Sequence, residues 1–594
     1  MKSPSDRPRT WRGVPNSSLI WVYLLPLVAA LLGGGLFVDE QWTASQWLPE
    51  VIIVLIALVL CWRSAVFRRP DRVDWLAIGL CGWCVAVDVW QGTCGVGTLL
   101  WQTVLLTHYM QLRRFPLEWH TLALLITSLT VCCALHRLGY GYGLWSTPLF
   151  RNSAGYGGAL VCGLPFAVAM AAKARSHWQK VLAAGGGVVI LWALWQTGSR
   201  TAWFALLLAA LGTGLYAVWP RLTRARRFAL AVAVIVGLSA GLVGLYRLRP
   251  ASADGRLLVY RVTVSCIAEA PLAGHGSRAI HRDYMPHQAA FLQAHPDHPA
   301  RLLADNVPYA FNEPLGFTVK YGFVGLLLLL AAIGLPLRQA LLHGPRRNTG
   351  WQYTVVAMSL ALAGMSLTSY PTAYSYLCLL GVSVLAVAGQ NPAVASGTGR
   401  RPLRLWAKAV CTLVGLMAVV TVGERAVAEC QWRKAAVLVR QGQTARALDR
   451  YASAGKALGD RPDFLYNHAA ELNLAGRYAD SQRMLGLCTR WLNNYDTELV
   501  AADNALATGA LAEAEHHLLQ AAAMVPARFM PHYGLLQVYG ERGDTAALCT
   551  TALHILAMPV KVPSADVDAI REAARDSIAR YGLGRRQPVP ADSR

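Results

Sequence analysis

The residues best suited to chemistry lie in one polar segment, from about Leu248 to Glu313. This polar segment is dense in arginine and histidine: Arg249, Arg256, Arg261, Arg278, Arg282, Arg301, His275, His281, His287, His295 and His298. Charged side chains are rare in apolar membrane helices, because each is costly there unless it is paired. We therefore expect any reaction that the protein carries out to take place at this segment.

A carboxylate stands where the polar segment meets the next apolar run. Glu313 is the only acidic residue at this boundary, and it directly follows Asn312. Nine residues separate Asn312 from Gly322-x-x-Gly325, whose glycines let a helix pack closely against a neighbour. A carboxylate at a half-buried interface can have a raised pKa and act as a general base. The alternative is a capped helix start with a solvated glutamate.

Two arginines open the polar segment. Arg256 and Arg261 are five residues apart, so they do not share an ideal helical face and should contact different groups. Arginine is suited to bidentate contacts with phosphate, although binding to lipid headgroups at the interface would also explain these residues. The turn Pro271-Leu272-Ala273-Gly274-His275-Gly276 closes the first helical stretch of the segment.

A third arginine lies outside the polar segment. Arg200 belongs to the short turn between two apolar runs, from Trp195 to Trp203. At the outer mouth of a helix pair an arginine is costly unless an anion pairs with it. An interfacial anchor that extends toward the headgroups is the alternative interpretation.

The elements that must position these residues are apolar helices. Of 594 residues, 55% are hydrophobic and 15% charged, and the mean hydropathy is positive, which is typical of a polytopic membrane protein. Runs of roughly 17–22 apolar residues are each about long enough to cross a membrane as a helix. We predict an all-α fold with about thirteen spans, at 18–38, 47–62, 73–91, 94–112, 118–137, 155–172, 178–196, 201–219, 228–247, 315–337, 351–369, 373–390 and 405–423.

The connections between these runs predict the orientation. Every second connection is basic and should face the cytoplasm, as for Arg113/Arg114 and Arg221/Arg224, whereas the alternate ones are acidic or neutral. This places the N-terminus in the cytoplasm, and the polar segment and the C-terminal region outside. We predict a tail at 1–17, a membrane domain at 18–423 with an exported loop at 248–313, a repeat domain at 426–580 and a tail at 581–594.

The C-terminal region has an internal period. Gly442, Gly476, Gly509 and Gly543 are 34, 33 and 34 residues apart. Small residues recur five and twelve positions after the first three glycines: Ala447, Ser481, Ala514, Ala454, Cys488 and Ala521. This spacing resembles the tetratricopeptide repeat, in which small residues let paired helices pack closely. We expect such a domain to bind an acceptor or a protein partner; an Ala-rich bundle with chance glycines is the alternative.

Composition and spacing argue against two other functions. The net charge of +22 comes from short basic loops without an aromatic-basic motif, so we do not expect binding to nucleic acid. The pair Cys81-x-x-Cys84 has no second pair, which argues against zinc. An Asp-x-Asp pair can hold a divalent cation, as in many glycosyltransferases. The one such pair, Asp566-Val567-Asp568, lies far along the chain from the apolar runs, so we interpret it as a solvated helix start.

Taken together, residues 140–337 resemble the superfamily of O-antigen ligases, Wzy-type O-antigen polymerases and bacterial protein O-oligosaccharyltransferases. The resemblance is carried by short motifs in a fixed order: Phe150-Arg151-Asn152 with Leu164-Pro165, Ser199-Arg200, Arg256 with Tyr260, Pro271 to Gly276, and Asn312-x9-Gly-x-x-Gly. It implies transfer of a glycan from undecaprenyl diphosphate to an acceptor hydroxyl outside the cytoplasmic membrane, without a metal ion or other cofactor.

Carried over to this chain, the resemblance implies that Arg200 and Arg256, with Arg261, hold the donor diphosphate. Many ligases have His-Asn-Glu where this sequence has Phe311-Asn312-Glu313. With that histidine absent, the base is Glu313, a loop histidine such as His275, or water.

The most probable function by resemblance is an O-antigen ligase of the bacterial inner membrane. Its acceptor would be lipid A-core, a growing glycan or a protein hydroxyl, and polymerase and protein O-oligosaccharyltransferase are the near alternatives. A glycolipid transporter or flippase would also place arginines near a cavity, but it should show internal repeats across its membrane part.

Overall fold

The computed structural model is entirely helical in the residues that it describes, which are 20–36, 44–63, 70–114, 119–144, 148–150, 152–174, 176–248, 250–343, 349–390 and 404–581. These residues contain 24 α-helices and three short 3-10 helices. They form two compact units. The membrane unit comprises Met1–Leu242 and Phe311–Val427, and the C-terminal unit comprises Val243–Ala310 and Ala428–Arg594. The predicted tails, Arg151 and several basic loops lie outside the described residues.

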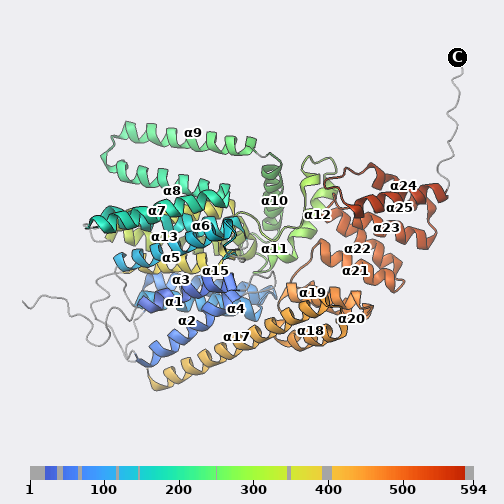
Figure 1. Cartoon of the computed structure of the whole chain (residues 1–594), viewed down its shortest axis with the longest axis horizontal. Coiled ribbons are helices and arrows are strands. Elements are labelled where there is room, and N and C mark those ends of the chain that lie inside the picture. Colours follow the sequence, from blue (N-terminus) through green and yellow to red (C-terminus); the bar gives the residue numbers. More distant parts are fainter. Residues whose placement is uncertain are drawn as a thin grey trace, which may run out of the picture. The chain divides into compact units, whose positions relative to one another are not determined.

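The membrane unit consists of long apolar helices (Figure 1). Their bounds are α1 Ile20–Leu36, α2 Ala44–Arg63, α3 Arg72–Trp90, α4 Val96–Arg114, α5 Trp119–Gly141, α6 Ser153–Lys173, α7 His177–Thr197, α8 Arg200–Val218, η3 Trp219–Arg221, α9 Arg224–Leu248, α13 Glu313–His343, α14 Thr349–Thr368, η5 Pro371–Ala373, α15 Ser375–Ala388 and α17 Leu405–Arg440. The end of α9 and the last part of α17 belong to the C-terminal unit.

A helix covers most of each of the thirteen predicted apolar ranges. Seven helices in the described chain are long and apolar enough to cross a membrane: α3, α5, α6, α7, α8 with η3, α13 and α17. Shorter apolar helices accompany them, among them α1, α2 and α15. The protein is thus a polytopic helical membrane protein, and the number of thirteen spans stays a prediction.

The core of the membrane unit is built around α6, whose small residues let other helices approach closely. A Cβ atom at Gly157 would lie 2.6 Å from the Ala202 side chain of α8, and one at Gly163 would lie 1.8 Å from the Thr130 hydroxyl of α5. Both positions therefore require glycine, because neighbouring side chains occupy the space that a Cβ would need.

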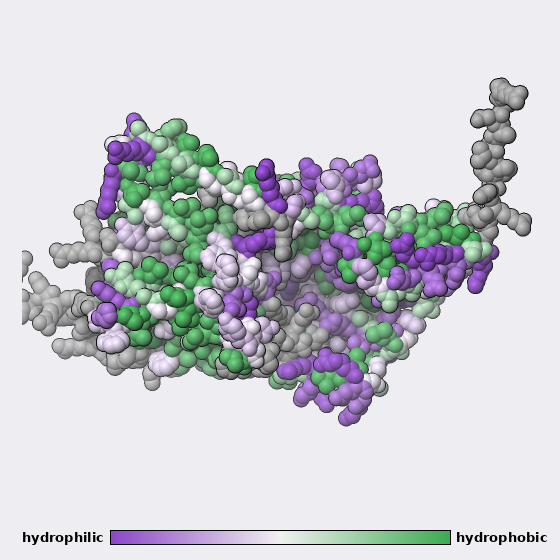
Figure 2. All heavy atoms as spheres, turned by 45° about the horizontal axis from the view of Figure 1, so that its top comes forward, coloured by the Kyte–Doolittle hydropathy of each residue, from purple (hydrophilic) through white to green (hydrophobic). Residues whose placement is uncertain are grey.

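The outer surface of the membrane unit is apolar. Figure 2 shows hydrophobic side chains over much of the visible face of its helices. Large side chains on α7 and α9 are among the most exposed, with 74% exposure for Trp178 and Leu182 and 75% for Phe228. A surface of this kind is suited to lipid rather than water.

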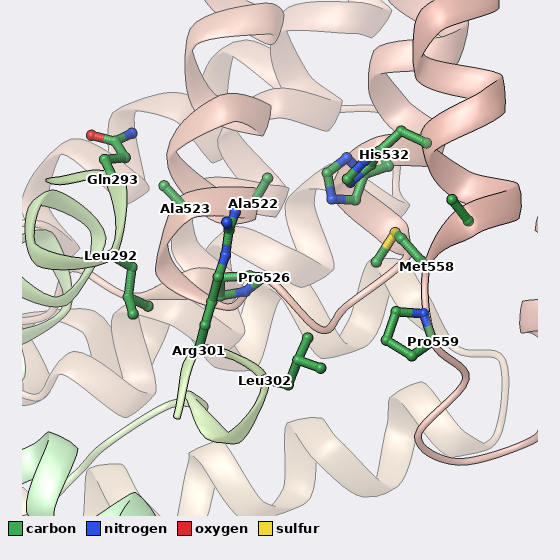
Figure 3. Close-up of a pocket in the computed structure, with 12 residues that line it drawn as sticks. Leu292, Gln293, Arg301, Leu302, Ala522, Ala523, Pro526, His532, Met558 and Pro559 are labelled. Carbon is green, nitrogen blue, oxygen red and sulfur yellow. The ribbon is translucent and has the colours of Figure 1, made fainter. Parts of the chain in front are cut away.

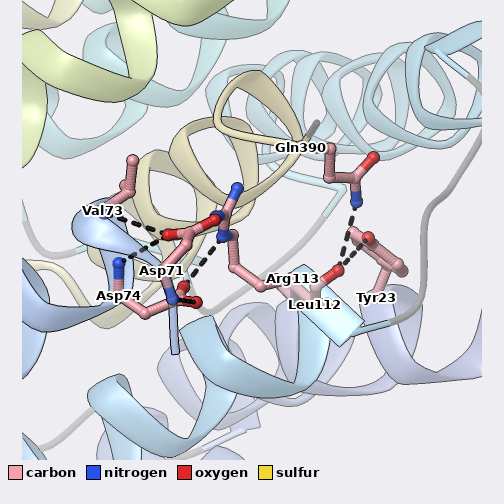
Figure 4. A network of polar contacts seen from close by, with 7 residues as sticks. All are labelled: Tyr23, Asp71, Val73, Asp74, Leu112, Arg113 and Gln390. Atoms are coloured by element: carbon pink, nitrogen blue, oxygen red, sulfur yellow. Dashed lines mark hydrogen bonds and ion pairs between the residues drawn. The ribbon is translucent and has the colours of Figure 1, made fainter. Parts of the chain in front are cut away.

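An ion-pair network closes the core at the start of α3 and the end of α4 (Figure 4). The Arg113 guanidinium is buried and donates hydrogen bonds to the carboxylates of Asp71 and Asp74, the latter at 3.0 Å. Asp71 also caps α3 by accepting hydrogen bonds from the backbone N–H groups of Val73 and Asp74. Pairing of this kind compensates the cost of burying these charges in a membrane protein.

The C-terminal unit joins the polar segment to the C-terminal helices. The polar segment forms α10 Pro250–Glu269, α11 Ala279–Arg282, α12 Tyr284–Ala294 and η4 Arg301–Leu303. The C-terminal helices are α18 Thr444–Leu458, α19 Pro462–Leu474, α20 Tyr478–Cys488, α21 Tyr495–Ala507, α22 Leu511–Met524, α23 Met530–Arg542, α24 Thr545–Ala557 and α25 Ala565–Tyr581. Consecutive members from α18 to α25 pack against one another.

The glycine period has a structural counterpart in these helices. All four periodic glycines adopt a positive φ of 70–75° in the turns before α18, α20, α22 and α24. The six small residues that recur after the first three glycines are fully buried. Alanine also stands three residues after each glycine, but these side chains are exposed and do not pack in the core: Ala445, Ala479, Ala512 and Ala546. These features support paired helical repeats, and their assignment as tetratricopeptide repeats stays a prediction.

Hydrogen bonds and an ion pair join the polar segment to the C-terminal helices. The fully buried Gln288 of α12 donates to the carbonyl oxygen of Met524 in α22 at 2.8 Å. The Asn306 amide donates to the Asp496 carboxylate of α21 at 2.7 Å, and Arg528 pairs with Asp305 at 3.1 Å. The two stretches therefore pack as one body although about 130 residues of sequence separate them.

Candidate active site

The start of α13 is fixed by the residues that the sequence singled out. Asn312 caps the helix, because its side-chain oxygen accepts a hydrogen bond from the Leu315 backbone N–H at 3.0 Å. Its amide group also donates to the carbonyl oxygen of Leu367 at the end of α14, at 3.3 Å. Both polar atoms of the Asn312 side chain are thus used to position the start of α13.

The Glu313 carboxylate points to the loop before α15. One of its oxygens, Oε1, accepts hydrogen bonds from both the backbone N–H and the hydroxyl group of Thr372, the former at 2.9 Å. The residue is half-buried. These contacts fix the carboxylate in one orientation, and no hydrogen bond is made to Oε2 within the described part of the chain. That oxygen can accept a proton.

Phe311 stands where the resemblance leads us to expect histidine, and its side chain packs against an aromatic neighbour. Its ring lies edge-on to Tyr370 with 5.6 Å between the ring centroids. The Tyr370 hydroxyl accepts a hydrogen bond from the Asn152 amide at 2.7 Å. Among the described non-glycine residues, Phe311 alone has a positive φ, of 53°. Such a backbone is unfavourable for a bulky residue and is kept where surrounding packing demands it.

Arg200 lies at the same end of the membrane unit as Asn312. Helices α8 and α14 run antiparallel, since Ala205 packs on Gly364 and Tyr216 contacts Tyr353. Arg200, which begins α8, is therefore on the side where α14 ends and where Asn312 contacts Leu367. Its side chain is exposed, and Ser199 caps the helix before it.

Arg137 is a basic residue at this end that the sequence analysis missed. It belongs to the end of α5 and donates a hydrogen bond to the Gln196 carbonyl oxygen at 2.6 Å, just before the Ser199-Arg200 turn. Its guanidinium also lies 5.7 Å from the centre of the Tyr156 ring. The position of Arg137 in the sequence could have indicated it. An arginine at the outer end of a predicted span departs from the alternation of basic loops.

The helix that carries Glu313 is interrupted at Gly322, which has φ 66° and ψ −176°. The Trp83 indole N–H donates to the Tyr321 carbonyl oxygen at 2.9 Å, beside this break. The Tyr321 hydroxyl in turn donates to the buried Asp88 carboxylate at 3.3 Å. A Cβ at Gly325 would lie 2.6 Å from Tyr321 and 3.1 Å from Trp83. Both glycines of Gly322-x-x-Gly325 thus shape α13, one by its backbone and one by close packing.

The remaining predicted site residues belong to the C-terminal unit. Arg256 and Arg261 lie on α10, and the former is half-buried while the latter is exposed. Burial raises the pKa of Tyr260, and the Arg256 guanidinium beside it opposes that rise. The Nη1 atom of Arg261 lies 3.5 Å from the Nε2 atom of the His298 ring. The two arginines contact different groups, in agreement with their spacing.

His275 is held in a turn between two glycines of positive φ, Gly274 and Gly276. Its Nε2–H donates to the Cys266 carbonyl oxygen near the end of α10 at 2.9 Å, and Nδ1 lies 3.8 Å from the Asp283 carboxylate. Arg282 donates to the His275 carbonyl oxygen at 3.3 Å. These contacts close the turn, so the geometry favours a structural role for this histidine over proton transfer.

The predicted site residues therefore fall into two sets. Arg200, Asn312 and Glu313 lie at one end of the membrane unit, whereas Arg256, Arg261 and His275 belong to the C-terminal unit. No group of three or more potential metal ligands occurs among the described His, Cys, Asp and Glu residues.

The fold and the site define a class of protein. It is a polytopic helical membrane protein with arginines and a fixed carboxylate at one end of its helix bundle. Residues 185–330 match the family described as O-Antigen ligase. The match covers Arg200, both arginines of α10, His275 and the start of α13 up to Gly325. No curated protein matches the chain. The match suggests transfer of a glycan at the membrane and implies lipid-linked glycan substrates.

Proposed function

We propose that the protein is a membrane glycosyltransferase that moves a glycan from polyprenyl diphosphate to an acceptor hydroxyl on the periplasmic side. The observation that carries the proposal is the fixed carboxylate of Glu313 at the start of α13, inside the region that matches O-Antigen ligase. The arginine at the same end of the bundle, Arg200, supports it.

In the proposed reaction, the acceptor oxygen attacks the anomeric carbon of the glycan. The bond between that carbon and the diphosphate oxygen breaks, and polyprenyl diphosphate leaves with the electron pair. Arg200, at the same end of the membrane unit as Glu313, stabilises the charge that develops on the leaving diphosphate, for which bidentate guanidinium contacts are well suited. For Arg256 and the exposed Arg261, both on α10, the resemblance implies binding of a diphosphate.

The proton of the acceptor goes to Oε2 of Glu313, because Thr372 occupies Oε1. Asn312 positions this carboxylate by capping α13 and by holding the end of α14. His275 is the alternative base, and we prefer Glu313 because a hydrogen bond to the Cys266 carbonyl oxygen holds one ring nitrogen of His275 in its turn. The reaction uses no metal ion in this proposal, so added EDTA should leave the rate unchanged.

Deleting the gene tests the reaction and identifies the acceptor. Loss of all high-mass lipopolysaccharide bands indicates a ligase, whereas bands with a single glycan unit indicate a polymerase. A change in glycoproteins alone indicates a protein O-oligosaccharyltransferase. If lipopolysaccharide, other glycans and glycoproteins all stay unchanged while the donor pool is intact, the proposed function is wrong.

A further inference from the structure

The C-terminal unit contains a cavity where the polar segment meets the C-terminal helices (Figure 3). Its volume is about 370 Å³, and its walls come from α12 and η4 on one side and from α22, α23, α24 and the residues that follow α22 and α24 on the other. Cavities that hold small ligands or short ligand segments begin at about this size.

The walls of the cavity are held together by bonds that do not enter it. Lys561 donates a hydrogen bond to the Leu302 carbonyl oxygen of η4 at 2.7 Å. Arg528 pairs with Asp305 just after η4, and Gln288 joins α12 to the end of α22. The cavity is therefore preformed and does not depend on a ligand to bring its two sides together.

Most of the lining is aliphatic, and four polar side chains interrupt it: Gln293, Arg301, His532 and His554. Arg301 extends from η4 toward α22 (Figure 3), and the rings of His532 and His554 lie with centroids 4.7 Å apart. The Arg301 guanidinium donates through Nη1 to the Pro296 carbonyl oxygen at 3.0 Å. No carboxylate is among the described residues that line the cavity.

The local charge favours an anion. Burial, together with the neighbouring His554 and Arg301, lowers the pKa of His532 to about 4. At neutral pH, His532 is therefore uncharged and Arg301 supplies positive charge, while an imidazole N–H remains as a hydrogen-bond donor. A guanidinium and an imidazole N–H beside an apolar wall match a carboxylate next to an aliphatic group.

The same lining favours a peptide over a sugar or an acyl chain. None of the described lining residues is Trp, Tyr or Phe, so the small rings of the two histidines are the only aromatic faces that these residues offer to a sugar ring. Its small side chains, such as Ala522, Ala523 and Pro526, leave room for a peptide backbone, and Gln293 offers an amide at the edge. An acyl chain has no group that could form a hydrogen bond with that amide.

We propose that this cavity binds the carboxyl end of a peptide, with an aliphatic last side chain against the apolar wall and the terminal carboxylate on Arg301. Capture of a terminal carboxylate is an established mode of peptide recognition. The site is separate from the proposed glycan transfer, and it makes the C-terminal unit a docking module for a protein.

Fluorescence polarisation with the full-length protein in detergent tests the proposal. The probe is a labelled peptide of four alanines followed by leucine with a free carboxyl end, and the matched probe is the same peptide amidated at its end. We expect the amide to bind about tenfold more weakly, because one charge-assisted contact is lost. Equal binding of the two probes, or no binding of either at millimolar concentration, overturns the proposal.

Two variants locate the site. Arg301→Gln should weaken binding of the free peptide by about tenfold without changing that of the amide. Ala557→Leu should weaken both, because Ala557 lines the cavity and is exposed, so a larger side chain fills the space without disturbing the core. Arg483→Gln is the control, since its side chain is 80% exposed outside the cavity. Octyl phosphate that binds in place of the peptide would identify a lipid-like anion and overturn the assignment.

Discussion

The Glu313 carboxylate accepts a hydrogen bond from the Thr372 backbone N–H at 2.9 Å, across 59 residues of sequence. This bond ties the start of α13 to the short helix η5. Because Thr372 contributes its backbone as well as its hydroxyl group, substitution of its side chain alone leaves one bond in place. The carboxylate is consequently positioned by the fold and not by a single side chain.

Glu313→Gln should reduce glycan transfer in vitro by about 10²–10⁴-fold, which is the usual cost of removing a general base. The amide keeps the size of the side chain and can still accept from Thr372, so the protein should stay folded and bind the lipid donor. Rates measured with purified protein and donor binding measured in parallel check this. Thr372→Val is the matched control, and its loss of activity should be much smaller. Full activity of Glu313→Gln would remove Glu313 from the mechanism.

The proposed diphosphate contacts predict a graded series of arginine variants. Arg200→Ala and Arg256→Ala should each abolish measurable transfer, and Arg256→Lys should recover little, because an ammonium group cannot make a bidentate contact. Arg261→Ala should have the smallest effect, since Arg261 is exposed. Transfer rates and donor affinity in detergent measure the order. A lysine at position 256 that restores the full rate would contradict a bidentate role.

Two glycines of α13 test whether this helix is held by close packing at Gly325. Gly325→Ala should destabilise the protein by on the order of 1–3 kcal/mol, because the new Cβ would collide with Tyr321 and Trp83. Gly334→Ala is the matched control: nothing lies within 4 Å of a Cβ there, and alanine is the better helix former. Thermal unfolding in detergent should therefore shift down for the first variant and stay equal or rise for the second. Equal shifts would show that the helix is not clamped at Gly325.

The sequence was sufficient to predict the helices, because apolar length and helix caps are local properties. Asn312 as a cap and the left-handed glycines before α18 and α20 follow from neighbours within a few residues. The number of membrane spans was harder to predict. Helix α4 carries Gln102 and Arg113 and is not among the seven helices that are apolar enough, yet both side chains have buried partners. Hydropathy does not register such pairing.

The candidate site could be predicted only in part, because its decisive contacts join distant residues. Thr372 has no motif of its own, and its bond to Glu313 appears only once η5 and α13 are placed together. The carbonyl group that Trp83 binds is likewise invisible in a sequence. His275 has the residue type of a base, and its hydrogen bond to the Cys266 carbonyl oxygen could not be read from the sequence.

The alternation of basic loops predicts that the N-terminus is cytoplasmic and the C-terminus periplasmic. A phosphatase reporter fused after Arg594 should be active, because this enzyme folds only outside the cytoplasm, and a fluorescent reporter that matures in the cytoplasm should be dark. Fusions of both reporters within the basic loop around Arg224 serve as the opposite control. A reporter after Arg594 that is active only in the cytoplasm would rule out the proposed orientation.

Two buried histidines predict how the C-terminal unit responds to acid. Burial lowers the pKa of His468 to about 4, and the ring stacks on Tyr451 with centroids 5.1 Å apart. The pKa of His532 is also about 4. In the unfolded chain both groups should titrate near about 6.5. Above that pH both states are neutral and the histidines contribute nothing to the pH dependence of stability.

Between about pH 6.5 and 4 the unfolded chain binds more protons than the folded one, so stability falls as the pH falls, by on the order of 3 kcal/mol per histidine over the whole window. Burial raises the pKa of Glu471, Asp496 and Asp503, which gives these carboxylates the opposite slope. Because carboxylates ordinarily titrate near about pH 4, the interval from about 7 to 5.5 isolates the histidine effect.

Hydrogen exchange of peptides from α19 and α23 in the full-length protein, corrected for the intrinsic pH dependence of exchange, measures the local stability over that interval. Protection should decrease toward pH 5.5 in the wild type. The change should be smaller in His468→Gln for α19 and in His532→Gln for α23, because glutamine cannot take up a proton in the unfolded chain. His295→Gln should behave like the wild type, since His295 is exposed. An unchanged pH dependence in a variant that carries both substitutions would show that other groups control the acid response.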